Sequence, residues 1–152
     1  MPFLDIAAHR IEYERIDAGG NDRPTLVFLH EGLGSIGMWR DFPGRVAHDT
    51  RCDAVVYSRF GYGNSDPLTG SRAVRYMHDE AAIALPQLLD RLAISRPILI
   101  GHSDGGSIAL IHAGSASSNV LGVVTLAAHV LVEDISVSSI AAAKAAYETT
   151  DL

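Results

Sequence analysis

The sequence is poor in cysteine, in basic charge and in long apolar runs, and each shortage excludes a class of protein. Cys52 is the only cysteine among 152 residues, so neither an internal disulfide nor a thiolate metal cluster can form. Only 12 basic residues face 18 acidic ones, and the formal net charge of -6 disfavours binding to nucleic acid or anionic lipid. We therefore expect no metal, no nucleic-acid partner and a cytoplasmic location.

Long apolar segments are also missing. The longest apolar stretch, residues 120–132, is interrupted by Gly122, Thr125 and His129 and is too short to cross a bilayer. The N-terminus carries Asp5 and has neither the basic start nor the apolar run of a signal peptide. We expect no membrane span and a mature chain that begins at Met1.

What is present is a core-forming composition with the rhythm of an α/β protein. Hydrophobic residues make up 47% of the chain, enough for one domain, and no linker or internal repeat divides residues 1–152. Residues 10–16 alternate apolar and polar as a half-exposed strand does, and four buried strands are predicted at residues 25–29, 54–57, 97–100 and 121–127. Helical patterns lie between these runs, which predicts a mostly parallel sheet flanked by helices.

The predicted helices differ in clarity. Residues 77–92 carry one apolar stripe at three- and four-residue steps, interrupted by Pro86, which predicts a kink or two abutting helices. Shorter helices are expected at residues 39–48 and 105–113. An alanine-rich helix at residues 135–147 follows Asp134, which is a suitable N-cap.

The strongest chemical motif is Gly101-His102-Ser103-Asp104-Gly105, a G-x-S-x-G sequence between a predicted strand and a predicted helix. In such an elbow the serine takes a strained backbone conformation that projects its hydroxyl above the sheet, while the glycines leave room for neighbouring backbone. The same letters also fit a glycine-rich turn whose helix N-terminus binds an anion. Context has to decide between the two.

Two further motifs follow predicted strands. The segment His30-Glu31-Gly32-Leu33-Gly34-Ser35 comes after residues 25–29, and a glycine-rich loop there can direct a backbone N–H at the alkoxide that forms when a serine attacks a carbonyl. The segment Ser58-Arg59-Phe60-Gly61-Tyr62-Gly63-Asn64-Ser65 comes after residues 54–57.

In this order, each at the end of its own strand, the three motifs resemble those of the serine-nucleophile branch of the α/β-hydrolase superfamily, over nearly the whole chain. The resemblance implies that Ser103 is the nucleophile and that the oxyanion hole uses the N–H of Asp104 with that of Gly32 or Leu33. Glu31 replaces a glycine of the family loop, and the loop of residues 58–65 has a structural role. No cofactor is implied, and the expected substrate is a small ester or related acyl compound.

The resemblance covers the N-terminal half of the family fold, so we expect a truncated α/β-hydrolase fold that ends near the start of the cap region. The family's triad acid and histidine follow later strands. Among the seven histidines, His129 is the best substitute base, although it also fits a satisfied buried polar group. His30 is expected to brace its loop, and His102 is expected to pack away from the serine.

Two functions therefore remain open. The first is a serine hydrolase, which the missing triad partners can leave inactive. The alternative is a non-catalytic remnant, a binding or assembly module with the hydrolase fold, and a third interpretation is an incomplete piece of a longer enzyme. In each case residues 121–127 would form an exposed sheet edge, through which we expect the chain to form a homo-oligomer.

Overall fold

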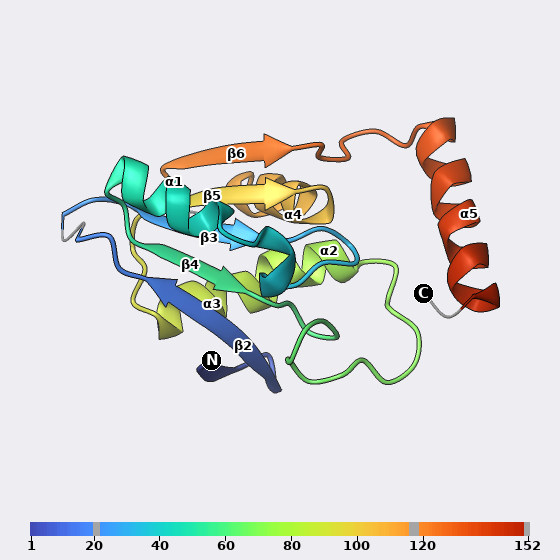
Figure 1. The fold of residues 1–152 in the computed structure, drawn as a ribbon, viewed down its shortest axis with the longest axis horizontal. Helices are drawn as coiled ribbons and strands as arrows, with labels where there is room; N and C mark the ends of the chain where they lie inside the picture. The colour runs from blue at the N-terminus through green and yellow to red at the C-terminus, as the bar shows by residue number, and fades with distance from the viewer. Residues whose placement is uncertain (20–21, 116–118, 151–152) are drawn as a thin grey trace.

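A computed structural model describes residues 1–19, 22–115 and 119–150. Within that part of the chain a single sheet has the strand order β1-β2-β4-β3-β5-β6 (Figure 1). Its strands are β1 (Phe3–Ile6), β2 (His9–Ile16), β3 (Thr25–Leu29), β4 (Ala54–Tyr57), β5 (Pro97–His102) and β6 (Gly122–Leu126). Strands β3 to β6 pair in parallel, while β1 and β2 pair antiparallel at one side. The predicted α/β fold class is confirmed, with a mixed sheet.

Helices cover both faces of this sheet, and the alternation of side chains along the strands decides which residues meet which helix. Val27 and Leu99 pack in one buried cluster with residues of α3 (Leu85–Arg91) and α4 (Asp104–Ala113). Leu26 and Ile100 belong to a second cluster on the opposite face, under α1 (Phe42–Thr50). The result is three layers, with the carboxyl ends of β3, β4 and β5 at one edge (Figure 1).

The connection between β4 and β5 ends in a composite helix. Its parts are α2 (Tyr76–Asp79), a π-helical segment η2 (Glu80–Ala84) and α3. Pro86 lies in the first turn of α3, where its missing N–H is tolerated. The expectation of abutting helices is confirmed, but the irregularity precedes the proline.

Two helix predictions need correction. The predicted helix over residues 39–48 is divided into a 3-10 turn, η1 (Ile36–Trp39), and α1, with Arg40 at a positive φ of 51° between them. The helix α5 (Asp134–Thr149) begins at Asp134, so Glu133 occupies the N-cap and no side chain caps it. Asp134 instead lies in the first turn, where a negative charge complements the helix dipole.

The last strand and helix are far more exposed than the rest. β6 is an edge strand, and Val124 and Leu126 are 48% and 39% exposed. The expected exposed edge at residues 121–127 is therefore confirmed, whereas the apolar pattern that predicted burial on both faces is wrong there. α5 stands apart from the layers and buries none of its residues (Figure 1). None of the helices in the described part of the chain has the length and apolar character needed to cross a membrane.

Candidate functional site

Ser103 occupies a sharp turn between β5 and α4. Its φ of 50° and ψ of −115° lie outside the regions that side-chain-bearing residues ordinarily adopt. A Cβ at Gly101 would collide with the carbonyl of Gly105, and one at Gly105 would collide with the carbonyl of Leu29. The strained serine is therefore held where β5, α4 and the neighbouring strand β3 pack closely against one another.

The loop after β3 is braced by His30, as its sequence position predicted. The buried ring accepts the N–H of Arg59 at Nε2, 3.0 Å away, which leaves Nδ1 to donate to the carbonyl of Glu31 at 2.7 Å. Burial, followed by the nearby Arg59 charge, lowers the pKa of His30 to about 3. The ring is therefore neutral and committed to the loop.

Arg59 ties this loop to the serine turn. Its guanidinium is 1% exposed, and Nη2 donates to the carbonyls of His30 and Glu31 at 3.3 and 2.8 Å. The same nitrogen lies 3.9 Å from Oδ2 of Asp104. The buried charge thus fixes both segments from which oxyanion donors were expected.

Behind Arg59, a buried carboxylate fixes the turn of residues 58–65. Glu12 accepts hydrogen bonds from the Ser58 hydroxyl at 2.6 Å and from the backbone and side-chain amides of Asn64 at 2.9 and 2.8 Å. Burial alone would raise the pKa of Glu12, but these bonds outweigh it and lower the pKa below its ordinary value. Gly63 is required here, since a Cβ would collide with the Glu12 carboxylate. The loop is structural, as the resemblance implied.

Asp104 is held by a residue that the sequence did not single out. The hydroxyl of Tyr76, on α2, donates to Oδ2 of Asp104 at 2.6 Å. Burial and this carboxylate raise the pKa of Tyr76. Gly32 lies against the same carboxylate, because a Cβ on Gly32 would stand 3.1 Å from Oδ2. Two of the expected oxyanion residues, Asp104 and Gly32, are therefore neighbours, while Leu33 is 67% exposed at the rim.

His129 reaches the serine. Its Nε2 lies 3.1 Å from Oγ of Ser103, within hydrogen-bond distance. Ser107, one turn into α4, holds the His129 backbone by accepting its N–H at 3.2 Å and donating to its carbonyl at 2.9 Å. An imidazole so placed can accept the serine proton. Within the described residues no carboxylate hydrogen-bonds to the other ring nitrogen of His129.

His102 does not simply pack, as had been expected. Its Nδ1 lies 3.2 Å from Oε2 of Glu31, and its side chain is 43% exposed. Glu31 thereby links the loop to β5. Its side chain also folds over Gly34, where a Cβ would lie 2.6 Å from the carboxyl carbon.

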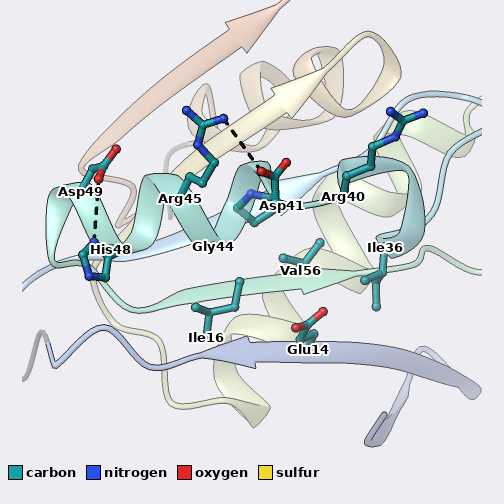
Figure 2. A pocket seen from close by; sticks show the side chains of 11 residues that line it. Glu14, Ile16, Ile36, Arg40, Asp41, Gly44, Arg45, His48, Asp49 and Val56 are labelled. Carbon is teal, nitrogen blue, oxygen red and sulfur yellow. Dashed lines mark ion pairs between the residues drawn. The ribbon is translucent and has the colours of Figure 1, made fainter.

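The candidate site lies in one cavity of about 840 Å³, which is lined by Ser103, His129, Tyr76, Arg72 and one face of α5. A second cavity of about 520 Å³ lies between α1 and strands β2 and β4 (Figure 2). The wall of this second cavity carries the surface ion pairs Arg45–Asp41 and His48–Asp49. Among its described lining residues, no nucleophilic side chain lies beside a base. The pair of Ser103 and His129 lies in the first cavity. No cluster of potential metal ligands occurs among the described residues.

Comparisons with known proteins agree with this architecture. A family profile described as "alpha/beta hydrolase fold" matches residues 24–144. A proline iminopeptidase of Lactobacillus delbrueckii subsp. lactis is 29% identical over 100 residues, which cover 66% of this chain and 34% of the relative. A putative carbamate hydrolase, RutD, of Pantoea ananatis is 34% identical over 99 residues, covering 64% and 34% of the two chains. The chain spans about a third of the length of these curated relatives.

Solved structures match over more of the chain. A structure from a study of carboxylesterases of the Thaumarchaeon Nitrososphaera gargenis superposes with a TM-score of 0.78 at 22% identity, covering 98% of this chain and 54% of that one. Est816, described as an N-acyl homoserine lactone degrading enzyme, gives a TM-score of 0.68 at 25% identity, covering 84% and 45%. Both the family profile and the fold lead to one conclusion: the chain belongs to the family of proteins with the alpha/beta hydrolase fold.

Proposed function

We propose that this chain carries the nucleophile and the oxyanion loop of a serine hydrolase that acts on a small ester or related acyl compound. The observation that carries the proposal is the 3.1 Å approach of His129 Nε2 to Ser103 Oγ, in a serine turn with the backbone strain of a nucleophile elbow. The names of the relatives, which include a peptidase, a putative carbamate hydrolase and carboxylesterases, favour a small substrate with a carbonyl group.

In the proposed reaction His129 takes the hydroxyl proton at Nε2 while Ser103 Oγ attacks the substrate carbonyl carbon. The alkoxide accepts hydrogen bonds from the backbone N–H of Asp104 and from that of Gly32 or Leu33. When the carbonyl re-forms, the ester C–O bond breaks and the leaving alcohol takes the proton back from His129. Water then attacks the acyl-enzyme by the same route and releases the acid.

The absence of a carboxylate on His129 Nδ1 within the described residues sets the expected rate. An acid at that nitrogen selects the tautomer and stabilises the imidazolium, and its loss in serine proteases costs about 10⁴-fold in kcat. We therefore expect turnover roughly four orders of magnitude below that of a complete triad, yet above the rate of water alone.

The test is hydrolysis of p-nitrophenyl butyrate together with labelling by a fluorophosphonate probe. Wild type, Ser103→Ala and His129→Gln are compared, with His48→Gln as an exposed histidine control. Turnover and labelling that disappear in the first two variants and persist in the control support the proposal. Equal background rates in all four proteins would leave the non-catalytic binding or assembly module as the function of the fold.

We also propose that the chain self-associates through β6. The strand is the sheet edge; Leu121 before it and Val124 and Leu126 within it are 51%, 48% and 39% exposed. Light scattering after size exclusion tests this, since a charge introduced by Val124→Lys should give the monomer. A cytoplasmic location stays a prediction from the single cysteine.

A further inference from the structure

Arg72 places a fixed positive charge on the wall of the Ser103 cavity. Its guanidinium carbon lies 4.6 Å from the ring centre of Tyr62 and 5.4 Å from that of Tyr76. Its Nη2 donates to the carbonyl of Phe60 at 3.1 Å. The side chain is only partly exposed, so two aromatic faces replace part of its water.

The backbone at Gly61 leaves the space in which the Arg72 guanidinium lies. Gly61 has a φ of 85°, and a Cβ there would stand 2.7 Å from Arg72 Nη2. Any other residue at position 61 would therefore be strained and would push the guanidinium away. The guanidinium is held by its hydrogen bond to Phe60 and by its contacts with the Tyr62 and Tyr76 rings.

The charge of Arg72 has no ion-pair partner within the part of the chain that the structure describes. The other charged groups around the cavity are engaged: Glu31 with His102, Asp104 with Tyr76 and Arg59, and Lys144 with Glu148. The Arg72 charge also acts on the partly buried Glu80, whose carboxyl accepts a hydrogen bond from the Tyr57 hydroxyl at 2.9 Å. Arg72 thus keeps N–H donors for a ligand that enters the cavity.

Tyr76 connects this charge to the reacting serine. Its ring stands beside the guanidinium, while its hydroxyl bonds the side chain of Asp104, the residue that follows Ser103. An acyl chain with its ester carbonyl at Ser103 can therefore run along the tyrosine to Arg72. A carboxylate at the far end of that chain would meet a partly desolvated guanidinium fork.

We propose that Arg72 is a specificity residue that binds a carboxylate on the acyl part of the substrate, so that the preferred substrates are monoesters of dicarboxylic acids. This inference rests on the proposed function of Ser103. It differs from that proposal in assigning the charge of the substrate.

The experiment measures kcat/KM for mono-p-nitrophenyl esters of succinic, adipic and suberic acid beside the neutral butyrate, hexanoate and octanoate esters. Arg72→Gln and Arg72→Lys are compared with Arg75→Gln, a matched control on the next turn of chain whose arginine pairs with Asp79 at 3.4 Å. We expect wild type to prefer the anionic series. Arg72→Gln should lower the anionic-to-neutral ratio by about ten- to hundredfold, the usual range for a hydrogen-bonded charge pair.

Arg72→Lys should keep part of the ratio, and Arg75→Gln should keep all of it. A wild-type ratio near one, or an equal loss of both series in Arg72→Gln, would overturn the inference and leave Arg72 as a support of its loop. High salt should reduce the ratio, since the pair is only partly buried.

A binding measurement separates this inference from the chemistry. Calorimetric titration of Ser103→Ala with adipate, in the presence and absence of Arg72→Gln, needs no turnover. Binding that the second substitution abolishes supports the carboxylate site even where no ester is hydrolysed. No binding of adipate to Ser103→Ala would contradict it even where neutral esters are turned over.

Discussion

The two sides of the candidate site are held in very different ways. On the nucleophile side, Arg59 and His30 are buried and bonded to each other's segments, and Gly101 and Gly105 lock the turn. On the base side, His129 follows an exposed edge strand, and Ser107 holds its backbone. The nucleophile side is thus fixed by the core, whereas the base side depends on a few contacts near the surface.

Damage to the two sides of the site should therefore appear in different measurements. Changes on the nucleophile side should disturb folding, because their partners are core elements. Changes on the base side should disturb rate, because their partners do little for stability.

Gly105→Ala should destabilise the protein most. The added Cβ would collide with the carbonyls of Leu29 and His30, which belong to a central strand and its loop and cannot move away. We expect a loss of about 3 kcal/mol or more in the free energy of unfolding, measured by urea denaturation. Gly44→Ala is the control, because a Cβ there has no atom within 4 Å and should stabilise α1 by about 0.5–1 kcal/mol. Equal stabilities of the two variants would refute the tight crossing.

Stability should depend on pH through His30. Its pKa is about 3 in the folded protein and about 6.5 when unfolded, so between these values the unfolded chain binds a proton that the folded chain excludes. The free energy of unfolding should therefore be greatest above pH 6.5 and fall as the pH drops towards 3, by up to about 1.4 kcal/mol per pH unit. His30→Gln should flatten this slope in urea titrations. The exposed His48→Gln should keep it, and a slope unchanged by His30→Gln would show that other groups cause it.

Ser107→Ala tests the base side. The substitution removes both hydrogen bonds to the His129 backbone. We therefore expect kcat for p-nitrophenyl butyrate to fall about tenfold, while the free energy of unfolding falls by about 1 kcal/mol. Ser138→Ala, on the exposed helix α5, serves as the control for the loss of a hydroxyl. A large loss of stability with no change in kcat would contradict the view that the contacts around His129 affect the rate rather than the stability.

Tyr76→Phe should have the smallest effect. This substitution removes the hydrogen bond to Asp104 but keeps the ring beside Arg72. We expect a few-fold fall in kcat and a loss of about 0.5–1.5 kcal/mol in the free energy of unfolding. The matched control is Tyr13→Phe on β2, whose hydroxyl has no hydrogen bond within the described residues. If both variants behave alike, the Tyr76 hydroxyl has no positioning role.

The sequence predicted those parts of the fold whose signals are local. The serine turn, the loop at His30 and the strands 25–29 and 54–57 each lie within a few consecutive residues, and all were located from such patterns. β1 was missed because its four residues include Asp5 and gain their structure by pairing with β2. The exposed edge at β6 was expected from the family's strand order, whereas the apolar pattern of residues 121–127 alone indicated a buried strand.

Long-range contacts explain the other misses. Glu12 meets Ser58 across 46 positions, and Tyr76 meets Asp104 across 28. His112 on α4 is 7% exposed, and its Nδ1 lies 2.8 Å from the carbonyl of Ala81, 31 positions away. No local pattern reveals such partners, because each polar group is satisfied only after the layers have packed.

The π-helical segment η2 determines the rotational phase of everything that precedes it. A π turn contains one residue more than an α turn, and one residue of α-helix corresponds to a rotation of about 100° about the axis. Rewinding η2 as a regular α-helix of the same length would turn α2 by that angle relative to α3. Tyr76 would then face away from Asp104, so one extra residue in this helix sets the direction of a side chain at the candidate site.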